Sequence, residues 1–201
     1  MEWLTRAIAR LVAVVLLVLI APLLLLLSVA AIFSMGRPVF FRQVRSGLHQ
    51  RPFTLYKFRS MTDARGQDGE LLSDEERVTA FGRFLRRSRL DELPGLVNIA
   101  RGEMAFVGPR PLLPPTIEGL GELGDMRARV RPGLTGWSQV NGNTLLSLER
   151  KVALDLWYVE NRSFWLDCRI VLATLWVMVG GERESLIARQ PELASDRTPR
   201  D

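Results

Sequence analysis

The feature that most constrains this chain is an uncharged apolar segment, Leu11–Phe33, close to its N-terminal end. The segment is longer than the about 20 residues that a helix needs to cross the hydrocarbon core of a bilayer. A helix that is apolar on every side does not suit the surface of a soluble domain. The segment therefore predicts a helix inserted in a membrane. It exceeds the about 7–15 apolar residues of a cleaved signal peptide.

Two features bear on how this helix sits in the membrane, and they leave two topologies open. Pro22 lies at its centre, removes one backbone N–H and clashes with the preceding turn, so a bend is expected at Ala21-Pro22. Basic residues favour the cytoplasmic side, and they flank both ends of the segment: Arg6, Arg10, Arg37, Arg42, Arg45 and Arg51. A re-entrant hairpin satisfies both features. From the residues alone, a straight spanning helix that tolerates one proline is an equal alternative.

The composition limits the chemistry that the rest of the chain can perform. A net charge of +5 and a pI of about 10.3 favour anionic partners such as nucleic acid, anionic lipid or a nucleotide. The membrane segment makes nucleic acid the least favoured of these. The single cysteine, Cys168, excludes an intramolecular disulfide, and the single histidine, His49, cannot build a metal cluster or a serine triad. No glycine-rich phosphate loop or dinucleotide fingerprint is present.

Periodicity and turn residues predict a mainly helical α+β domain with one short β-hairpin. The hairpin strands are expected at Val39–Val44 and Phe53–Phe58. Between the expected helices we predict a loop (62–73), an irregular stretch (104–115) and a turn-rich stretch (131–143). The expected helices are Asp74–Arg87, Leu90–Arg101, Ile117–Val130 and Leu148–Asn161.

The C-terminal part adds one more apolar stretch, Trp165–Val179, which is short for a membrane span. Its tryptophans suit a membrane interface, and a buried core helix is an equal alternative. The predicted organisation is an anchor at 1–36, a catalytic domain at 37–181 and a charged, partly disordered tail at 182–201.

The adjacent acids Asp91 and Glu92 are the strongest candidates for chemistry. Carboxylates are common in the first turn of a helix, and Ser88 precedes them at the spacing of a capping box, so a purely structural role is the simplest interpretation. The same geometry can serve catalysis, because an ionised carboxylate can attack phosphorus while its neighbour holds a divalent metal.

Several basic residues, with one glycine and one threonine, are further candidates for binding phosphate. Arginine forks match phosphate oxygens, and glycine lets the backbone approach an anion. The candidates are Lys57, Arg59, Arg86, Arg110, Arg131, Gly133 and Thr135. Two further acids interrupt apolar helical patterns. Asp155 is expected to pair with Lys151 one turn earlier, and Asp167 is expected to be an interfacial cap or a proton acceptor.

Five blocks in a fixed order make the chain similar to the bacterial sugar transferases, specifically the small monotopic phosphoglycosyl transferases. The resemblance extends from the membrane segment to about residue 180. The blocks are KFRSM (57–61), LDELP (90–94), NIARGEMAFVGPRP (98–111), RPGLTGWSQVNG (131–142) and YVENRSFWLD (158–167). Together they replace the purely structural interpretation of Asp91 and Glu92.

The resemblance implies transfer of a phosphosugar from a UDP-sugar to polyprenyl (undecaprenyl) phosphate, with release of UMP, as the first step of a surface glycan. It implies that Asp91 is the nucleophile of a covalent phosphosugar intermediate and that Glu92 is tied to Mg²⁺. Lys57, Arg59 and Arg86 fall in the implied active-site region. Arg110 and Arg131, with Gly133 and Thr135, match phosphate- or nucleotide-contacting loops, and Asp167 matches an aspartate that helps to activate the lipid phosphate.

The resemblance also implies a place in the cell. It favours the re-entrant hairpin broken at Pro22, which keeps the catalytic domain on the cytoplasmic face of the bacterial inner membrane, in contact with membrane lipid. Nucleic acid is not an expected partner, because stacking aromatics and a recognition helix are missing. A membrane-tethered scaffold without turnover is the other alternative, and the intact acid pair argues against it.

The chain departs from the family pattern at three places. Gly95 follows LDELP, where glutamine is common in the family. Ala21 precedes Pro22, where a small polar residue is usual. Asn143 ends the sequence NGN (141–143), where the family often has arginine. These differences bear on the membrane break and on the choice of sugar.

Overall fold

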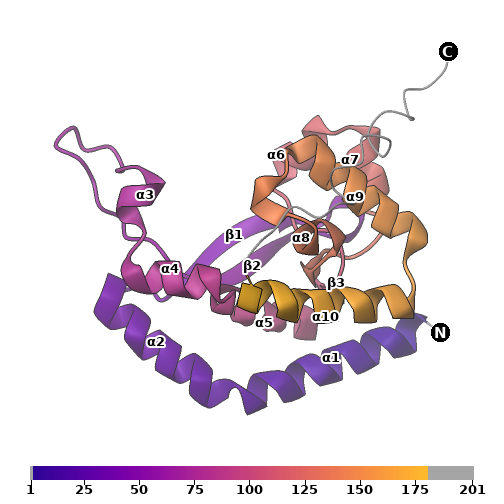
Figure 1. Ribbon diagram of the computed structural model, residues 1–201, viewed down its shortest axis with the longest axis horizontal. Coiled ribbons are helices and arrows are strands. Elements are labelled where there is room, and N and C mark those ends of the chain that lie inside the picture. Colours follow the sequence, from indigo (N-terminus) through magenta and orange to yellow (C-terminus); the bar gives the residue numbers. More distant parts are fainter. Residues whose placement is uncertain (1, 181–201) are drawn as a thin grey trace. The chain divides into compact units, whose positions relative to one another are not determined.

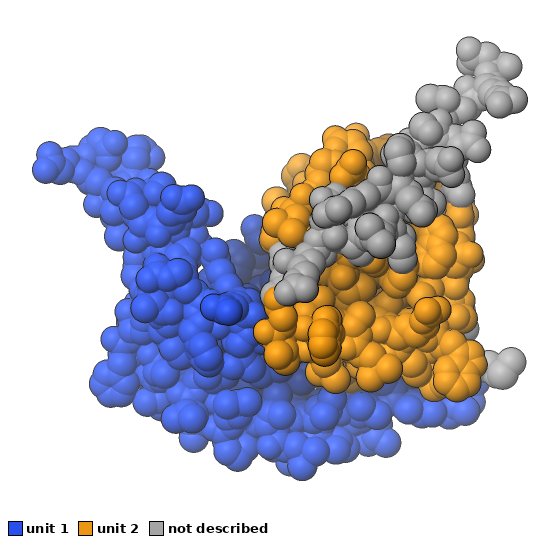
Figure 2. Space-filling model, in the orientation of Figure 1, with its two compact units in different colours: residues 1–43, 54–102 blue, residues 44–53, 103–201 orange. Residues whose placement is uncertain are grey.

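The computed structural model of the protein describes residues 2–180, and Figure 1 shows its elements. By its contacts the chain forms two compact units, coloured separately in Figure 2. Of the described residues, the first unit comprises 2–43 and 54–102, and the second comprises 44–53 and 103–180. The division at residues 36 and 181 that the sequence suggests stays a prediction. The tail expected to be partly disordered, 182–201, lies outside the described residues.

The apolar segment forms two helices with a bend between them. Helix α1 spans Glu2–Leu19, helix α2 spans Ala21–Met35, and the two are bent by 60°. The break falls at Ile20, and Pro22 lies in the first turn of α2, where its missing N–H costs no helical hydrogen bond. Among the described helices none is both long and apolar enough to cross a bilayer alone, whereas this bent pair meets that requirement together. The predicted bend is therefore present.

One face of the bent helix pair packs on other helices of the first unit, and the rest of its apolar surface is exposed. Helix α1 packs on α5 (Leu96–Arg101), and α2 packs on α4 (Ala80–Arg87). Leu27 of α2 joins Phe58 and Leu85 in a buried apolar cluster. On the other faces the exposed large apolar side chains include Leu11, Val18, Leu19, Leu25, Leu26 and Phe33.

The predicted hairpin is confirmed, with strands β1 (Phe40–Ser46) and β2 (Pro52–Phe58) joined through a short 3₁₀ turn, η1 (Leu48–Gln50). The side chain of Asn98, in α5, forms two hydrogen bonds with the backbone of β2. Its Oδ1 accepts from the Tyr56 N–H at 3.2 Å, and its Nδ2 donates to the Thr54 carbonyl at 2.7 Å. A fully buried amide thus satisfies backbone groups that a sheet edge would otherwise leave unpaired.

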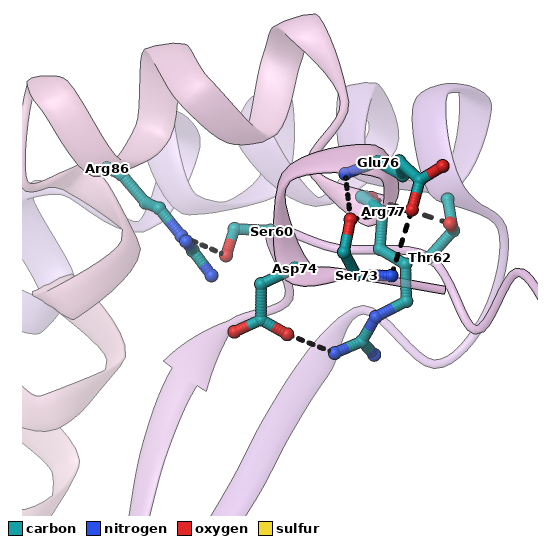
Figure 3. Close-up of polar contacts among 7 residues, drawn as sticks. All are labelled: Ser60, Thr62, Ser73, Asp74, Glu76, Arg77 and Arg86. Carbon is teal, nitrogen blue, oxygen red and sulfur yellow. Dashed lines mark hydrogen bonds and ion pairs between the residues drawn. The ribbon is translucent and has the colours of Figure 1, made fainter. Parts of the chain in front are cut away.

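A single helix was predicted at Asp74–Arg87. That prediction is wrong in its continuity, because the structure has two helices there, α3 (Asp74–Arg77) and α4. Each part has its own N-cap. The Ser73 hydroxyl and the Glu76 carboxylate form a reciprocal capping box, and the Thr79 hydroxyl accepts from the Gly82 N–H at 3.0 Å (Figure 3 shows the first of these). The extended backbone that Thr79 needs as an N-cap interrupts the helix. The preceding stretch, 62–73, is a loop as predicted.

The second helix predicted in this unit, Leu90–Arg101, also divides. It begins as a 3₁₀ helix, η2 (Leu90–Gly95), and continues as α5. Pro94 lies inside η2, and proline cannot donate the backbone hydrogen bond that a regular α-helix would require there.

The second unit contains two strands that the sequence did not predict. Strand β3 (Ala105–Val107) pairs in parallel with β4 (Gly133–Thr135), with Ala105 opposite Gly133 and Val107 opposite Thr135. These strands lie in the stretches predicted to be irregular and turn-rich. The helix predicted at Ile117–Val130 is also divided, into α6 (Pro114–Gly119) and α7 (Glu122–Arg127), because Gly121 adopts a positive φ of 54°.

The core of the second unit forms around α9 and α10. Helix α9 (Leu148–Asn161) has the predicted bounds, and α10 spans Phe164–Gly180. Val107, Tyr158, Leu166 and Ile170 form a buried cluster. The turn before α9 contributes α8 (Trp137–Val140) and the 3₁₀ turn η3 (Asn143–Leu145).

Helix α10 contributes to this core along one side only. Only Leu166 and Ile170 are buried among its apolar residues. Most of its large apolar side chains are exposed, namely Phe164, Trp165, Val171, Leu172, Leu175, Trp176 and Val179. The exposure fits the interfacial alternative better than the core alternative.

Candidate active site

Asp91 and Glu92 lie in the first turn of η2, which begins directly after Arg89, a residue in the left-handed region (φ 55°). The capping box suggested by Ser88 is wrong. The Ser88 hydroxyl donates backwards, to the carbonyls of Phe84 at 2.7 Å and Leu85 at 3.2 Å, and so closes α4. No side chain caps η2. The acid pair therefore follows a sharp change of chain direction and has no serine cap.

Lys57 and Arg89 both place a positive charge near the Glu92 carboxylate. Lys57 Nζ, on β2, lies 2.7 Å from Oε1, and Arg89 NH1 lies 3.9 Å from Oε2. The Lys57 and Glu92 side chains are 20% and 13% exposed, so the ion pair is partly buried and still reached by water. The structure thus joins the predicted residues Lys57 and Glu92 directly. Arg89 is a member of the site that the sequence analysis did not single out.

The other two basic candidates of the first unit make separate contacts. Arg86 Nε donates to the Ser60 hydroxyl at 2.8 Å, which ties α4 to the segment after β2 (Figure 3). Arg59 NH2 lies 2.6 Å from the Asp63 carboxylate, and its NH1 donates to the Arg37 carbonyl at 3.1 Å. Ser60 is buried and was not predicted as a site residue.

Glycines join the two candidate phosphate loops of the second unit. The Gly108 N–H donates to the Thr135 carbonyl, and the Gly133 N–H donates to the Pro109 carbonyl, each at 2.9 Å. A Cβ on Gly108 would lie 2.4 Å from the Arg131 carbonyl oxygen, and a Cβ on Gly133 would lie 2.1 Å from the Gly108 nitrogen. Only glycine permits this close approach. It brings the backbone just before Arg110 against the backbone just after Arg131.

Gly133 and Thr135 make contacts within the fold. The Gly133 N–H is occupied by Pro109, and the Thr135 hydroxyl lies 2.6 Å from the Thr174 hydroxyl of α10. Thr135 is buried. Their predicted role in binding substrate stays a prediction, and in the structure they position the loops that carry the two arginines.

Arg110 belongs to a cationic group in the second unit. Burial and the nearby charge of Arg110 lower the pKa of Arg45, whose NH1 donates to the Pro111 carbonyl at 3.2 Å. Arg110 and Arg131 are both half-buried. Arg45 and Arg110 are thus close enough for their like charges to repel each other.

A buried ion pair, Arg127–Asp155, supports the Arg110 loop. Arg127 NH2 and Nε lie 2.7 and 2.8 Å from Asp155 Oδ2, and both side chains are almost fully buried. The Ser138 hydroxyl donates to Asp155 Oδ1 at 2.7 Å, and Arg127 NH2 also donates to the Arg110 carbonyl. The expected pair between Asp155 and Lys151 is therefore wrong, because α9 turns Asp155 inward.

Sequence reasoning missed Arg127. The only signal for it was Asp155, an acid within an apolar helical pattern, which would need a cationic partner if it were buried. Burial raises the pKa of Asp155, and Arg127 and Ser138 oppose that shift. A carboxylate in such a place needs its cation, since an unpaired buried charge is very costly.

Asp167 lies in the first turn of α10 and accepts a hydrogen bond from the Tyr158 hydroxyl at 2.7 Å. Burial raises the pKa of Asp167, while Tyr158 and Arg162 lower it. Burial, together with the hydrogen bond and charge of Asp167, raises the pKa of Tyr158. A carboxylate with a raised pKa is a stronger base, as a proton acceptor requires.

The acid pair could supply the protein ligands of a Mg²⁺ ion that is bound jointly by the protein and by the substrate phosphates. Within residues 2–180 no three histidine, cysteine or acidic side chains are grouped so that they could hold a metal. Mg²⁺ is commonly held by one or two carboxylates and by substrate phosphates. Glu92, with Asp91 beside it, is a donor set of that size.

A sequence profile of the family described as bacterial sugar transferase matches residues 1–181. The chain belongs to the bacterial sugar transferase family. Among its relatives in this family, an "Uncharacterized sugar transferase EpsL" of Bacillus subtilis is 47% identical over 166 residues, which cover 82% of each chain. The family resemblance drawn from the five sequence blocks is thereby confirmed.

Relatives with named activities are mostly longer. An "Undecaprenyl-phosphate glucose phosphotransferase" of Komagataeibacter xylinus is 42% identical over 85% of this chain and 35% of its own length. A "UDP-glucose:undecaprenyl-phosphate glucose-1-phosphate transferase" of Escherichia coli is 38% identical over 86% of this chain and 39% of its own. The chain thus spans less than half the length of these two relatives.

Proposed function

We propose that this bacterial sugar transferase moves a phosphosugar from a UDP-sugar to polyprenyl phosphate, releases UMP and so begins a surface glycan. The names of its longer relatives support both substrates. We place the enzyme at the inner membrane of a bacterium, with its catalytic part on the cytoplasmic face, where nucleotide sugars are made.

In the first step, an Asp91 carboxylate oxygen attacks the phosphorus that bears the sugar. The new oxygen–phosphorus bond forms as the bond from that phosphorus to the bridging oxygen breaks, and UMP leaves with the bridging oxygen. Arg86, Arg110 and Arg131 are assigned to the phosphates, because guanidinium forks match their oxygens. The protein is left as an acyl phosphate of Asp91 that carries the sugar.

In the second step, a phosphate oxygen of the lipid attacks the same phosphorus. The bond to Asp91 breaks, its carboxylate is restored and the product is a polyprenyl diphosphate sugar. If the lipid phosphate carries a proton, that proton passes to a base, and we assign this role to Asp167. Two successive displacements predict ping-pong kinetics.

Glu92, beside Asp91, is the residue we assign to Mg²⁺. When bound, Mg²⁺ neutralises charge on the diphosphate as UMP departs. Lys57 holds the Glu92 carboxylate at 2.7 Å and so keeps its orientation fixed. This contact, between two residues of separate sequence blocks, is the observation that carries the proposal.

Contacts at both ends of the apolar segment support the re-entrant topology. A Cβ on Gly102, after α5, would lie 2.1 Å from Arg10 NH2, so the Arg10 side chain lies against the end of α5. The Ser34 hydroxyl donates to the Thr79 hydroxyl, the N-cap of α4, at 3.1 Å. A straight helix over this segment would separate its ends by about 35 Å, across the bilayer. Both ends instead contact the same unit.

Cysteine labelling tests this topology. Cysteines placed at positions 10 and 37 are expected to react with an impermeant maleimide only from the cytoplasmic face. Labelling from opposite faces would reject the re-entrant topology.

UMP release tests the reaction itself. With a matching UDP-sugar, the protein is expected to release about one equivalent of UMP without lipid and many with polyprenyl phosphate. Asp91→Asn removes the nucleophile and is expected to release none. UMP release by Asp91→Asn at the parent rate would reject Asp91 as nucleophile.

A further inference from the structure

The first unit contains a cavity of about 550 Å³ at the start of β1, which we call the β1 groove. Its lining combines apolar and charged side chains from two stretches of the chain. The lining residues used below are Pro38, Phe40, Phe41, Arg42, Arg59 and Asp63.

The apolar side of the β1 groove has aromatic residues that remain open to a ligand. Phe40 and Phe41 are 40% and 45% exposed, although both are large and apolar. Phe40 is fixed against the buried Phe58, with ring centroids 5.3 Å apart. Phe40 therefore gives the groove one fixed apolar side.

The charged side of the groove has two guanidinium groups. Arg59 is 11% exposed and is held in place by the Arg37 carbonyl. Arg42 lies over the Tyr56 ring, with its Cζ 5.7 Å from the ring centroid. A ligand that matches both sides must have an apolar chain and an anionic head.

The groove also begins where the apolar helices end. Helix α2 ends at Met35, and the groove lining starts three residues later at Pro38. Phe33, in the last turn of α2, is 87% exposed. A chain that leaves the bilayer beside α2 would therefore reach the groove directly.

We propose that the β1 groove binds an isoprenyl phosphate, with the chain along Phe40 and Phe41 and the phosphate at Arg59. This inference rests on the proposed function, because it assigns the lipid acceptor to a place in the molecule. It also gives Asp63 a role that neither the sequence blocks nor the relatives supply.

Asp63 occupies the proposed phosphate position when no lipid is bound. Its carboxylate lies 2.6 Å from Arg59 NH2, and its side chain is 74% exposed. An ion pair with so exposed a partner is weak, so a phosphate can displace it at little cost. Asp63 thus competes with the lipid phosphate for Arg59.

The test is a titration of farnesyl phosphate into the full chain in detergent, without any sugar donor. Phe41→Ala is expected to weaken binding about ten-fold, because it removes apolar contact area. Asp63→Asn is expected to strengthen it about two- to five-fold, because Arg59 loses its competing carboxylate. Phe84→Ala, an exposed phenylalanine of α4, is the matched control and is expected to bind as the parent does.

Opposite effects of Phe41→Ala and Asp63→Asn would support the groove, since a general loss of folding cannot tighten binding. Inorganic phosphate and farnesol should each bind more weakly than farnesyl phosphate. Unchanged binding in both variants, or equal changes in Phe84→Ala, would overturn the proposal.

This experiment separates the groove from the reaction. If UMP release follows the proposed function while farnesyl phosphate binding ignores the groove variants, the groove is wrong and the reaction stands. If the variants shift binding as expected but no donor yields UMP, the groove binds isoprenyl phosphate and the proposed reaction fails.

Discussion

Two ion pairs of equal length have different surroundings, and the difference separates a reactive site from its support. Lys57–Glu92 in the first unit and Arg127–Asp155 in the second both have closest N–O distances of 2.7 Å. The first pair is 20% and 13% exposed, whereas the second is 5% and 2% exposed. Only the first is open enough for a ligand to reach its carboxylate while the ion pair stays intact.

The comparison shows what burial does to an ionic contact. In the wetter pair, water screens the charges, so removing Lys57 leaves Glu92 solvated. In the dry pair, removing either partner leaves a buried charge with no solvent to compensate it. We therefore expect Lys57 to matter for activity and Asp155 for stability.

The largest expected effect on stability follows from breaking the dry pair. Asp155→Ala leaves Arg127 buried without its carboxylate, which is expected to cost about 3–5 kcal/mol of unfolding free energy. Thermal unfolding in detergent measures the loss. Glu149→Ala, on the same helix and exposed, is the control. A loss in Asp155→Ala no larger than in this control would contradict the comparison.

A double replacement sharpens the same point. Arg127→Met with Asp155→Leu removes both charges, so much of the stability is expected to return. The Arg110 carbonyl then lacks its donor, and the KM for the UDP-sugar is expected to rise while stability stays near that of the parent. Restored stability with an unchanged KM would show that the pair does not position Arg110.

The second effect concerns the wetter pair. Lys57→Met is expected to lower the unfolding free energy by less than about 1 kcal/mol and to lower kcat about 100-fold, because Glu92 loses its orientation. UMP release and thermal unfolding measure the two effects. Lys151→Met replaces the other lysine of the chain and is the control. A large loss of stability in Lys57→Met would remove the distinction between the two pairs.

The third effect depends on pH and extends the comparison to Tyr158 and Asp167. Burial and Asp167 raise the pKa of Tyr158 above its unfolded value of about 10. Its contribution to stability is therefore complete below about pH 10 and is lost as the pH rises further. The Tm of the parent is expected to fall more steeply above pH 10 than that of Tyr158→Phe. Equal alkaline slopes would contradict the assigned cause.

The smallest effect is expected at Ser60. Ser60→Ala removes the 2.8 Å hydrogen bond to Arg86 and is expected to cost about 1 kcal/mol or less. UMP release at limiting UDP-sugar should fall about two- to five-fold, as Arg86 becomes less ordered. Exposed Ser147, the N-cap of α9, gives the control Ser147→Ala. Unchanged UMP release by Ser60→Ala would show that Arg86 does not depend on Ser60.

Residue patterns within one segment predicted the elements whose structure depends on that segment alone. Helix α9 has the predicted bounds because its apolar spacing is regular, and the hairpin was visible from its aromatic strands and turn residues. Strands β3 and β4 were missed because each has only three residues and pairs with a partner distant in the sequence. The break at Thr79 was missed because a threonine cap competes with an otherwise continuous helical pattern.

The candidate site shows the same limit. The sequence blocks predicted Asp91, Glu92 and Lys57 as site residues, and the contact between Lys57 and Glu92 came from the structure. Asp155 was noticed as an acid within an apolar pattern, but its partner is Arg127, 28 residues away, and not the nearer Lys151. Pairing across such distances depends on how α7 and α9 pack.

The most direct test of the central claim is intact-protein mass spectrometry after incubation with Mg²⁺ and a panel of UDP-sugars, without polyprenyl phosphate. The account predicts a phosphosugar adduct on the parent protein, absent from Asp91→Asn and removed when polyprenyl phosphate is added. The mass of the adduct would identify the class of sugar. An adduct that persists in Asp91→Asn, or UMP release in the presence of lipid with no adduct in its absence, would contradict the covalent role of Asp91.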